Sequence, residues 1–195
     1  LECKEFVKYL GIFIKQNLTW KHHIDHVAFK ISRYVGILSK LRPNSYTNNH
    51  LSLYHFTTFN LRLVSLGSSL KSHFEKLLKL QKRALKFSYF SDFKQHAVPL
   101  FIEAGVLPLK FSFIKITAYL LYDVRHKIEP SRIQTQFQDI SNTHPYCTRS
   151  SASNNFYTQS SRLSIKLNSF SRIGSTIWNG IPLTLKNLRT TSAGK

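Results

Sequence analysis

The stretch TWKHHIDHVAFKISRYVGILSKL, residues 19–41, decides the fold of this chain. Its apolar residues recur at alternating spacings of four and three, which is the period of one face of an amphipathic helix. These residues are Trp20, Ile24, Val27, Ile31, Tyr34, Leu38 and Leu41. Thr19 is suited to cap the helix at its start, and Pro43 is suited to end it. The stretch therefore predicts a long helix that buries this face.

Four side chains of types that can bind a metal lie at the start of this helix: His22, His23, Asp25 and His26. His22 and His26 lie four residues apart on one helical face, as two zinc ligands would, and Asp25 could orient one of them. Zinc takes three or four ligands, however, and no Cys-x-x-Cys or glutamate follows at a useful spacing. We therefore favour the alternative that His22 and His26 lie on solvent-facing turns, with Asp25 favoured there by the helix dipole. His23, next to Ile24, is predicted to pack or cap at the helix start.

The residues around this helix predict one strand and further helices. A short apolar run with β-branched residues, residues 5–14, predicts the strand. Helical spacing of apolar residues predicts helices over residues 47–63, 72–87 and 108–124, and a short turn over 98–105 is ended by Gly105. The expected buried sides are Phe74, Leu77, Leu78, Gln81, Ala84 and Leu85 on the third helix, and Phe113, Ile116, Leu120 and Val124 on the fourth.

The composition changes after Lys127. Residues 129–161 are rich in Ser, Thr, Asn and Gln, which predicts a long loop or a partly disordered linker. Leu163, Ile165 and Leu167 then alternate with polar residues, which predicts a half-buried strand. Residues 171–188 predict two short helical turns with a proline between them. A tail of this size is too short to hold a large core alone.

The chain is strongly basic, with 28 Lys and Arg against 9 Asp and Glu and a formal net charge of +19. Such an excess favours a polyanionic partner, nucleic acid before a membrane surface. A generically basic protein is the alternative. Cys3 and Cys147 are the only cysteines, which argues against a disulfide framework and favours a reducing compartment. No apolar run is long enough to span a membrane.

Basic residues mark the polar sides of two predicted helices. The first carries Lys30, Arg33 and Lys40, and the third carries Lys79, Lys82, Arg83 and Lys86, with Glu75 as the acidic residue on that side. Rows of cations can follow a phosphate backbone. A charge run is more often a solvated face, but one with so few acidic partners favours binding. Tyr9, Tyr89 and Phe90 could stack on bases or belong to the core, and the sequence leaves both open.

Catalytic signatures are scarce in this sequence. It has no Gly-rich phosphate loop and no Gly-x-Ser-x-Gly motif, and its nine acidic residues are scattered. Phosphoryl transfer with two metal ions needs clustered carboxylates. We therefore expect no such chemistry from this stretch by itself.

The order of short motifs along the chain resembles the reverse transcriptase of non-LTR (LINE-type) retrotransposons. Residues 8–42, KYLGIFIKQNLTWKHHIDHVAFKISRYVGILSKLR, are similar to the family's Lys-Tyr-Leu-Gly strand, its Leu-Thr-Trp and His-Ile, and its long helix ending in Leu-x-Lys-Leu. Residues 78–87, LKLQKRALKF, are similar to its Leu-Gln-Lys-Arg/Lys-Ala helix. The resemblance continues through VPLFIEAGVLPL (98–109), HPYCTRSS (144–151) and IGSTIWNGIPLTLK (173–186). It covers nearly the whole chain.

This resemblance implies a segment that follows the catalytic palm. Residues 1–18 would end the palm, with Tyr9, Leu10 and Gly11 as the primer-grip element, where a glycine allows close approach of a nucleic-acid backbone. Residues 19–128 would form the helical thumb, and a polar linker over 129–161 and a tail over 162–195 would follow. The expected fold class is mainly α: an N-terminal strand or hairpin, a thumb-like bundle of about four helices, and a loop-rich tail with a short strand and short helices.

The same resemblance implies the partners. The template–primer duplex of RNA and DNA would bind the basic helix faces, and the upstream palm and fingers would belong to the same polyprotein, in cytoplasm and nucleus. The polymerase carboxylates would lie before Leu1, so Mg²⁺ is expected only in that palm and no cofactor is expected here. We expect an excerpt of a longer enzyme, inactive alone. Residues 59–69, FNLRLVSLGSS, depart from the family because they lack its Tyr-Gly or Tyr-Cys followed by a tryptophan.

Two other hypotheses remain from the residues themselves. The chain could be a non-enzymatic, basic helical module that is structural or binds proteins, with incidental charge. A metal-dependent hydrolase built on His22 and His26 would instead require stoichiometric zinc, which we do not expect from two ligands.

Overall fold

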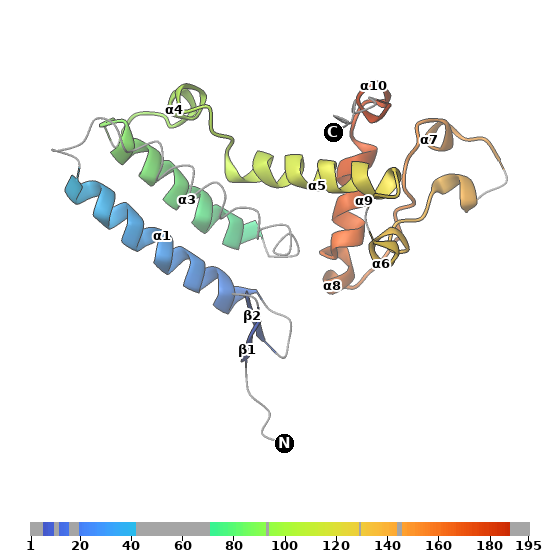
Figure 1. The fold of residues 1–195 in the computed structure, drawn as a ribbon, viewed down its shortest axis with the longest axis horizontal. Helices are drawn as coiled ribbons and strands as arrows, with labels where there is room; N and C mark the ends of the chain where they lie inside the picture. Colours follow the sequence, from blue (N-terminus) through green and yellow to red (C-terminus); the bar gives the residue numbers. More distant parts are fainter. Residues whose placement is uncertain are drawn as a thin grey trace, which may run out of the picture. The chain divides into compact units, whose positions relative to one another are not determined.

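The computed structural model describes residues 6–9, 12–15, 20–41, 71–92, 94–128, 130–143 and 146–187. In this part the chain is mainly helical, with an antiparallel hairpin of two strands, then long helices, and shorter helices toward the C-terminus (Figure 1). The expected fold class is therefore confirmed. The chain forms two compact units, Leu1–Phe113 and Ile114–Lys195, and each is described by itself.

The hairpin comes from the run for which a strand is predicted. Strand β1, Phe6–Tyr9, pairs with strand β2, Ile12–Lys15, and Val7 lies opposite Ile14 in the register. The β-branched and aromatic residues of this run favour extended backbone.

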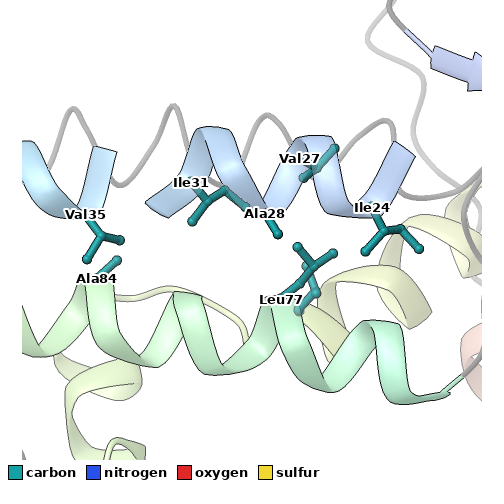
Figure 2. Packing of buried hydrophobic residues seen from close by; sticks show 8 residues of the cluster. Ile24, Val27, Ala28, Ile31, Val35, Leu77 and Ala84 are labelled. Carbon is teal, nitrogen blue, oxygen red and sulfur yellow. The ribbon is translucent and has the colours of Figure 1, made fainter. Parts of the chain in front are cut away.

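Helices α1, Lys21–Leu41, and α3, Lys71–Ser88, form the core of the first unit. They lie side by side and run in the same direction (Figure 1). Figure 2 shows Ile24 and Ala28 of α1 beside Leu77 of α3, and Val35 beside Ala84. Thr19 and Pro43, the predicted cap and stop of α1, and the helix predicted over residues 47–63 lie outside the described residues.

The buried side of α1 differs from the prediction at three positions. Ala28 and Val35 are buried, whereas Tyr34 is 66% exposed. At about 100° per residue, Val35 lies about 20° from Ile24 around the helix axis, whereas Tyr34 lies about 80° from it. The seam that faces α3 therefore follows Ile24, Ala28, Ile31 and Val35. The side chains of Leu38 and Leu41 lie outside the description.

Helix α3 buries the side that its sequence predicts: Leu77, Gln81, Ala84 and Leu85 are buried and Leu78 is partly buried. The side chain of Phe74 is not among those described. Gln81 bridges α3 to the chain that enters helix α5, Leu109–Arg125. Its Nε2 donates to the carbonyl of Leu107 at 3.1 Å, and its Oε1 accepts from the backbone N–H of Leu109 at 2.9 Å. A buried amide thus satisfies two backbone groups where α5 begins.

The short helix α4, Val98–Glu103, lies where a helical turn is predicted, and Gly105 follows it with φ of +62°. On α5, Phe113 and Val124 are buried as predicted, but Thr117 and Leu121 are buried in place of Ile116 and Leu120, which are partly exposed. The predicted buried positions are shifted by one residue, because the pattern of apolar residues does not include the polar Thr117.

The second unit builds its core from the polar part of the chain as well as from helices. Its short helices are α6, Ser131–Gln134; η2, Ile140–Asn142; α7, Arg149–Ala152; α8, Ser164–Leu167; α9, Phe170–Asn179; and α10, Leu183–Lys186. Phe137 and Phe156, from the predicted linker, are buried with Leu121, Val124 and Trp178. The Asn179 side chain accepts from Phe156 N and donates to Phe156 O, both at 2.9 Å.

The strand predicted over residues 162–170 is wrong, because residues 164–167 form helix α8. Leu163 and Leu167 lie four positions apart, a spacing that suits a helical turn as well as a strand, and the N–H of Leu167 donates to the carbonyl of Leu163 at 3.0 Å. The two predicted helical turns after it are α9 and α10, with Pro182 at the start of α10. The four predicted segments, 1–18, 19–128, 129–161 and 162–195, stay a prediction.

No helix in the described ranges is long and apolar enough to cross a membrane. Cys147 is an exposed free thiol. Cys3 lies outside the described residues.

Candidate nucleic-acid interface

Four cations form the outer side of α3. Lys79, Lys82 and Arg83 are exposed and Lys86 is partly exposed. Lys79 and Lys86 lie two and nine residues after the buried Leu77, about 200° and 180° around the helix. The four cations extend over about 10 Å of the helix axis. We call Lys79, Lys82, Arg83 and Lys86 the α3 basic face.

Acidic neighbours of the α3 basic face are few. Glu75 is exposed one turn before Lys79 on the same side of the helix. In the described ranges, no carboxylate lies within ion-pair distance of Lys79, Lys82 or Arg83. The guanidinium of Arg83 lies 5.6 Å from the ring centroid of Phe87, which holds the cation beside the helix. This surface therefore presents concentrated positive charge.

The three predicted cations of α1 lie on a different surface. Lys30, Arg33 and Lys40 are all exposed. Arg33 and Lys40 lie two and nine residues after the buried Ile31, so they too point about 180–200° from their helix's buried seam. Since the seams of α1 and α3 face one another (Figure 2), the two sets of cations lie on opposite sides of the helix pair. The structure does not bring them together into one patch.

The hairpin contacts the start of α1 through an aromatic and histidine cluster. The Phe13 ring lies 5.4 Å from that of His22 and 4.8 Å from that of His26, centroid to centroid. The backbone N–H of Phe13 donates to Nδ1 of His23 at 3.4 Å. Lys8 Nζ lies 5.8 Å from the Phe13 centroid. Packing against the hairpin therefore gives three histidines a structural role.

The three histidines differ in burial. His23 is 2% exposed, which confirms the predicted packing role, and His22 is exposed as predicted. His26 is half-buried, not the surface residue that was expected. Burial, and then the charges of Lys30 and Lys8 and the nearby His22, lower the pKa of His26 from its ordinary value.

Asp25 contacts a lysine of the other helix. Its carboxylate pairs with Lys76 Nζ of α3 at 2.5 Å, and both side chains are about half exposed. In the part of the chain that the structure describes, no three His, Cys, Asp or Glu side chains come together as a metal site would require.

Of the three predicted primer-grip residues, the structure describes Tyr9. Tyr9 is 64% exposed on β1. Leu10 and Gly11 lie outside the described residues. Of the other aromatics considered for stacking, Phe90 is 43% exposed, whereas Tyr89 packs against the small cluster around Leu85. The hypothesis of base stacking therefore applies to Tyr9 and Phe90 and not to Tyr89.

The sequence did not point to a second cationic site, in the unit Ile114–Lys195. Arg125 and Lys186 line one cavity there, although they lie far apart in the sequence. No local spacing relates these two residues, so no sequence motif predicts that they lie together.

Comparison of the chain with protein-family models, curated proteins and solved structures finds no match.

Proposed function

We propose that this chain is the primer-grip and thumb portion, with the C-terminal tail, of a reverse transcriptase of the non-LTR retrotransposon type. Its own activity is sequence-independent binding of the backbone of a template–primer duplex. The polymerase chemistry belongs to carboxylates outside this sequence, and Mg²⁺ acts with them.

The observation that carries this proposal is the α3 basic face. Four cations share one side of α3, opposite its buried seam, and the nearest acidic residue on that side is Glu75. A protein that neutralises phosphates with Lys and Arg gains affinity by releasing counterions, without reading the base sequence. The ordered motifs that resemble this enzyme family, LKLQKRALKF on α3 among them, support the same proposal.

The proposal is tested by the salt dependence of binding to an RNA–DNA hybrid. The test variant combines Lys79→Gln, Lys82→Gln, Arg83→Gln and Lys86→Gln. The control variant combines Lys94→Gln, Lys110→Gln, Lys115→Gln and Arg132→Gln, which removes the same charge from four exposed positions elsewhere. Each lost phosphate contact should reduce the slope of log K against log salt by about 0.9 in magnitude, by analogy with duplex DNA.

We expect the test variant to lose about two to four units of slope and the control to lose less than about one. Circular dichroism checks that both variants keep wild-type helicity. Wild-type binding that does not respond to salt, or equal losses in the two variants, would contradict the proposal.

A second candidate function, a helical module that binds proteins, is favoured by exposed apolar side chains on α1. Phe29, Tyr34 and Ile37 are 63%, 66% and 52% exposed. Exposed apolar groups of this size are common at protein interfaces. This candidate predicts that the test variant binds the hybrid as the wild type does.

A further inference from the structure

The unit Ile114–Lys195 contains a cavity of about 350 Å³ that the proposed duplex grip does not use. It is lined by Arg125, His126, Asn154, Trp178, Lys186 and Asn187. These residues come from the end of α5, the turn after α7, α9 and α10. None of them belongs to the α3 basic face or to the cations of α1.

Lys186 is a buried cation in this cavity wall, with only 5% of its surface exposed. Its Nζ donates to Asn155 Oδ1 at 2.6 Å and to the carbonyl of Ser153 at 3.3 Å, and lies 5.7 Å from the centroid of the Trp178 ring. All of these partners are neutral. In the described ranges, no carboxylate lies within ion-pair distance of this ammonium. Burying a charge without an opposite charge is unfavourable.

Arg125 is the second cation that lines the cavity. Its guanidinium pairs with the carboxylate of Asp139, donates to Asn154 Oδ1 at 3.2 Å, and lies 5.9 Å from the Phe156 ring centroid. A guanidinium has five N–H donors in a planar fork, so these bonds leave donors for a further acceptor. Counting Arg125, Lys186 and Asp139, this group carries one positive charge in excess.

The two cations are close enough to affect one another. Burial, and then the positive charge of Arg125, lower the pKa of Lys186 from its ordinary value. An anion between them would relieve both effects, since it would supply the missing opposite charge and reduce the repulsion. Arg and Lys side by side are typical of sites that bind phosphate oxygens.

We propose that this cavity binds a phosphate group, held by the guanidinium of Arg125 and the ammonium of Lys186. His126 and Asn187 lie at the exposed rim, where a nucleotide that carries the phosphate would enter. The orientation of His126 is set, because its Nδ1 lies 2.8 Å from the carbonyl of Tyr122 and its ring stacks on the Tyr122 ring at 4.0 Å. The phosphate comes either from a nucleic-acid backbone or from a free or terminal monoester.

Trp178 provides a local probe of this site. The chain has two tryptophans, and only Trp178 lines the cavity, where its Nε1–H donates to the carbonyl of Asn154 at 2.9 Å. The indole N–H signals of the full chain are followed by NMR during titration with inorganic phosphate. Sodium chloride at the same ionic strength is the reference, and Trp20→Phe assigns the two signals.

We expect a saturable shift of the Trp178 signal with phosphate and none beyond the chloride reference for Trp20. Lys186→Gln should weaken binding about tenfold or more, because a charge-assisted contact is lost. Lys115→Gln, an exposed lysine in the same unit, should leave the affinity unchanged. Should Lys186→Gln not fold, Asn187→Asp replaces it, because an added carboxylate at the rim should repel the anion to a similar extent.

A second titration distinguishes the two sources of the phosphate. Its probe is a dinucleotide whose one phosphate is the internal diester. A Trp178 response to this probe identifies the backbone as the source, and a response to inorganic phosphate alone identifies a free or terminal monoester. No saturable Trp178 response to either probe, or an unchanged affinity in Lys186→Gln and Asn187→Asp, would overturn the proposal. These titrations do not involve the α3 basic face, so their outcome is independent of the duplex test.

Discussion

At position 81 a polar side chain lies on the most buried side of α3. Gln81 is 1% exposed, and its amide pairs with one backbone carbonyl and one backbone N–H where α5 begins. Helical spacing places Gln81 on the inward side, but only the fold supplies its two partners. A buried amide is tolerated there because both of its polar atoms are hydrogen-bonded.

Replacing this amide tests that account. Gln81→Leu should destabilise the chain by about 1–3 kcal/mol for each backbone group that it leaves unpaired. The measurement is urea unfolding followed by circular dichroism. Lys82→Leu, the same substitution at the next and exposed position, is the control and should change stability by less than about 0.5 kcal/mol. Equal stability of the two variants would show that the bonds of Gln81 contribute nothing.

His26 predicts a dependence of stability on pH. Its pKa is lowered in the folded chain by burial first, and then by Lys30, Lys8 and His22. In the unfolded chain its pKa is about 6.5. Between these two values the unfolded chain binds more protons, so the free energy of unfolding falls as the pH falls through about 6.5. We expect His26→Gln to show a smaller fall between pH 7.5 and 5.5, measured by chemical denaturation.

An NMR titration of the His26 ring tests whether its lowered pKa causes this dependence of stability on pH. The ring should titrate below about 6.5 in the folded chain. A His26 ring that titrates above that value would mean that packing against the hairpin does not disfavour the charged imidazolium.

At the scale of helices, the packing of α1 on α3 decides what each basic side can reach. Both helices direct their buried seams toward one another, and both carry cations about 180–200° away from that seam. A single nucleic-acid surface laid on the α3 basic face therefore does not contact Arg33 or Lys40. The sequence predicts only the face within each helix, and the packing of the two helices decides how these faces lie relative to one another.

This arrangement predicts independent effects on hybrid binding. A variant with Lys30→Gln, Arg33→Gln and Lys40→Gln should change the binding free energy by an amount that adds to that of the α3 test variant, within about 0.5 kcal/mol. The measurement is a double-mutant cycle with the two sets at one salt concentration. A coupling energy above about 1 kcal/mol would indicate that both sides contact the same ligand.

At the scale of the whole molecule, cations occur in both units. The α3 basic face belongs to Leu1–Phe113, and the pair of Arg125 and Lys186 belongs to Ile114–Lys195. The net charge of +19 is therefore not confined to one site. Charge at this scale raises association rates and non-specific affinity for polyanions. If both proposals hold, the local sites then determine where a phosphate is held.

The sequence by itself determined those helices and helix faces that follow from the spacing of residues within one segment. The positions of α1, α3, α4 and α5 and the outward side of α3 all follow from spacings within one segment. Residues three and four positions apart are neighbours on any α-helix, whatever surrounds it, so these predictions needed no tertiary contact.

Only the tertiary structure decided which of several permitted arrangements is formed. It selected Val35 over Tyr34 for the seam of α1, where Val35 packs against Ala84 of α3 (Figure 2). It buried Phe137 and Phe156 in a segment that its polar composition had assigned to a linker, and it placed Arg125 beside Lys186 in one cavity. Each of these outcomes depends on contacts between residues that are distant in the sequence. A pattern within one segment cannot predict the free energy of such contacts.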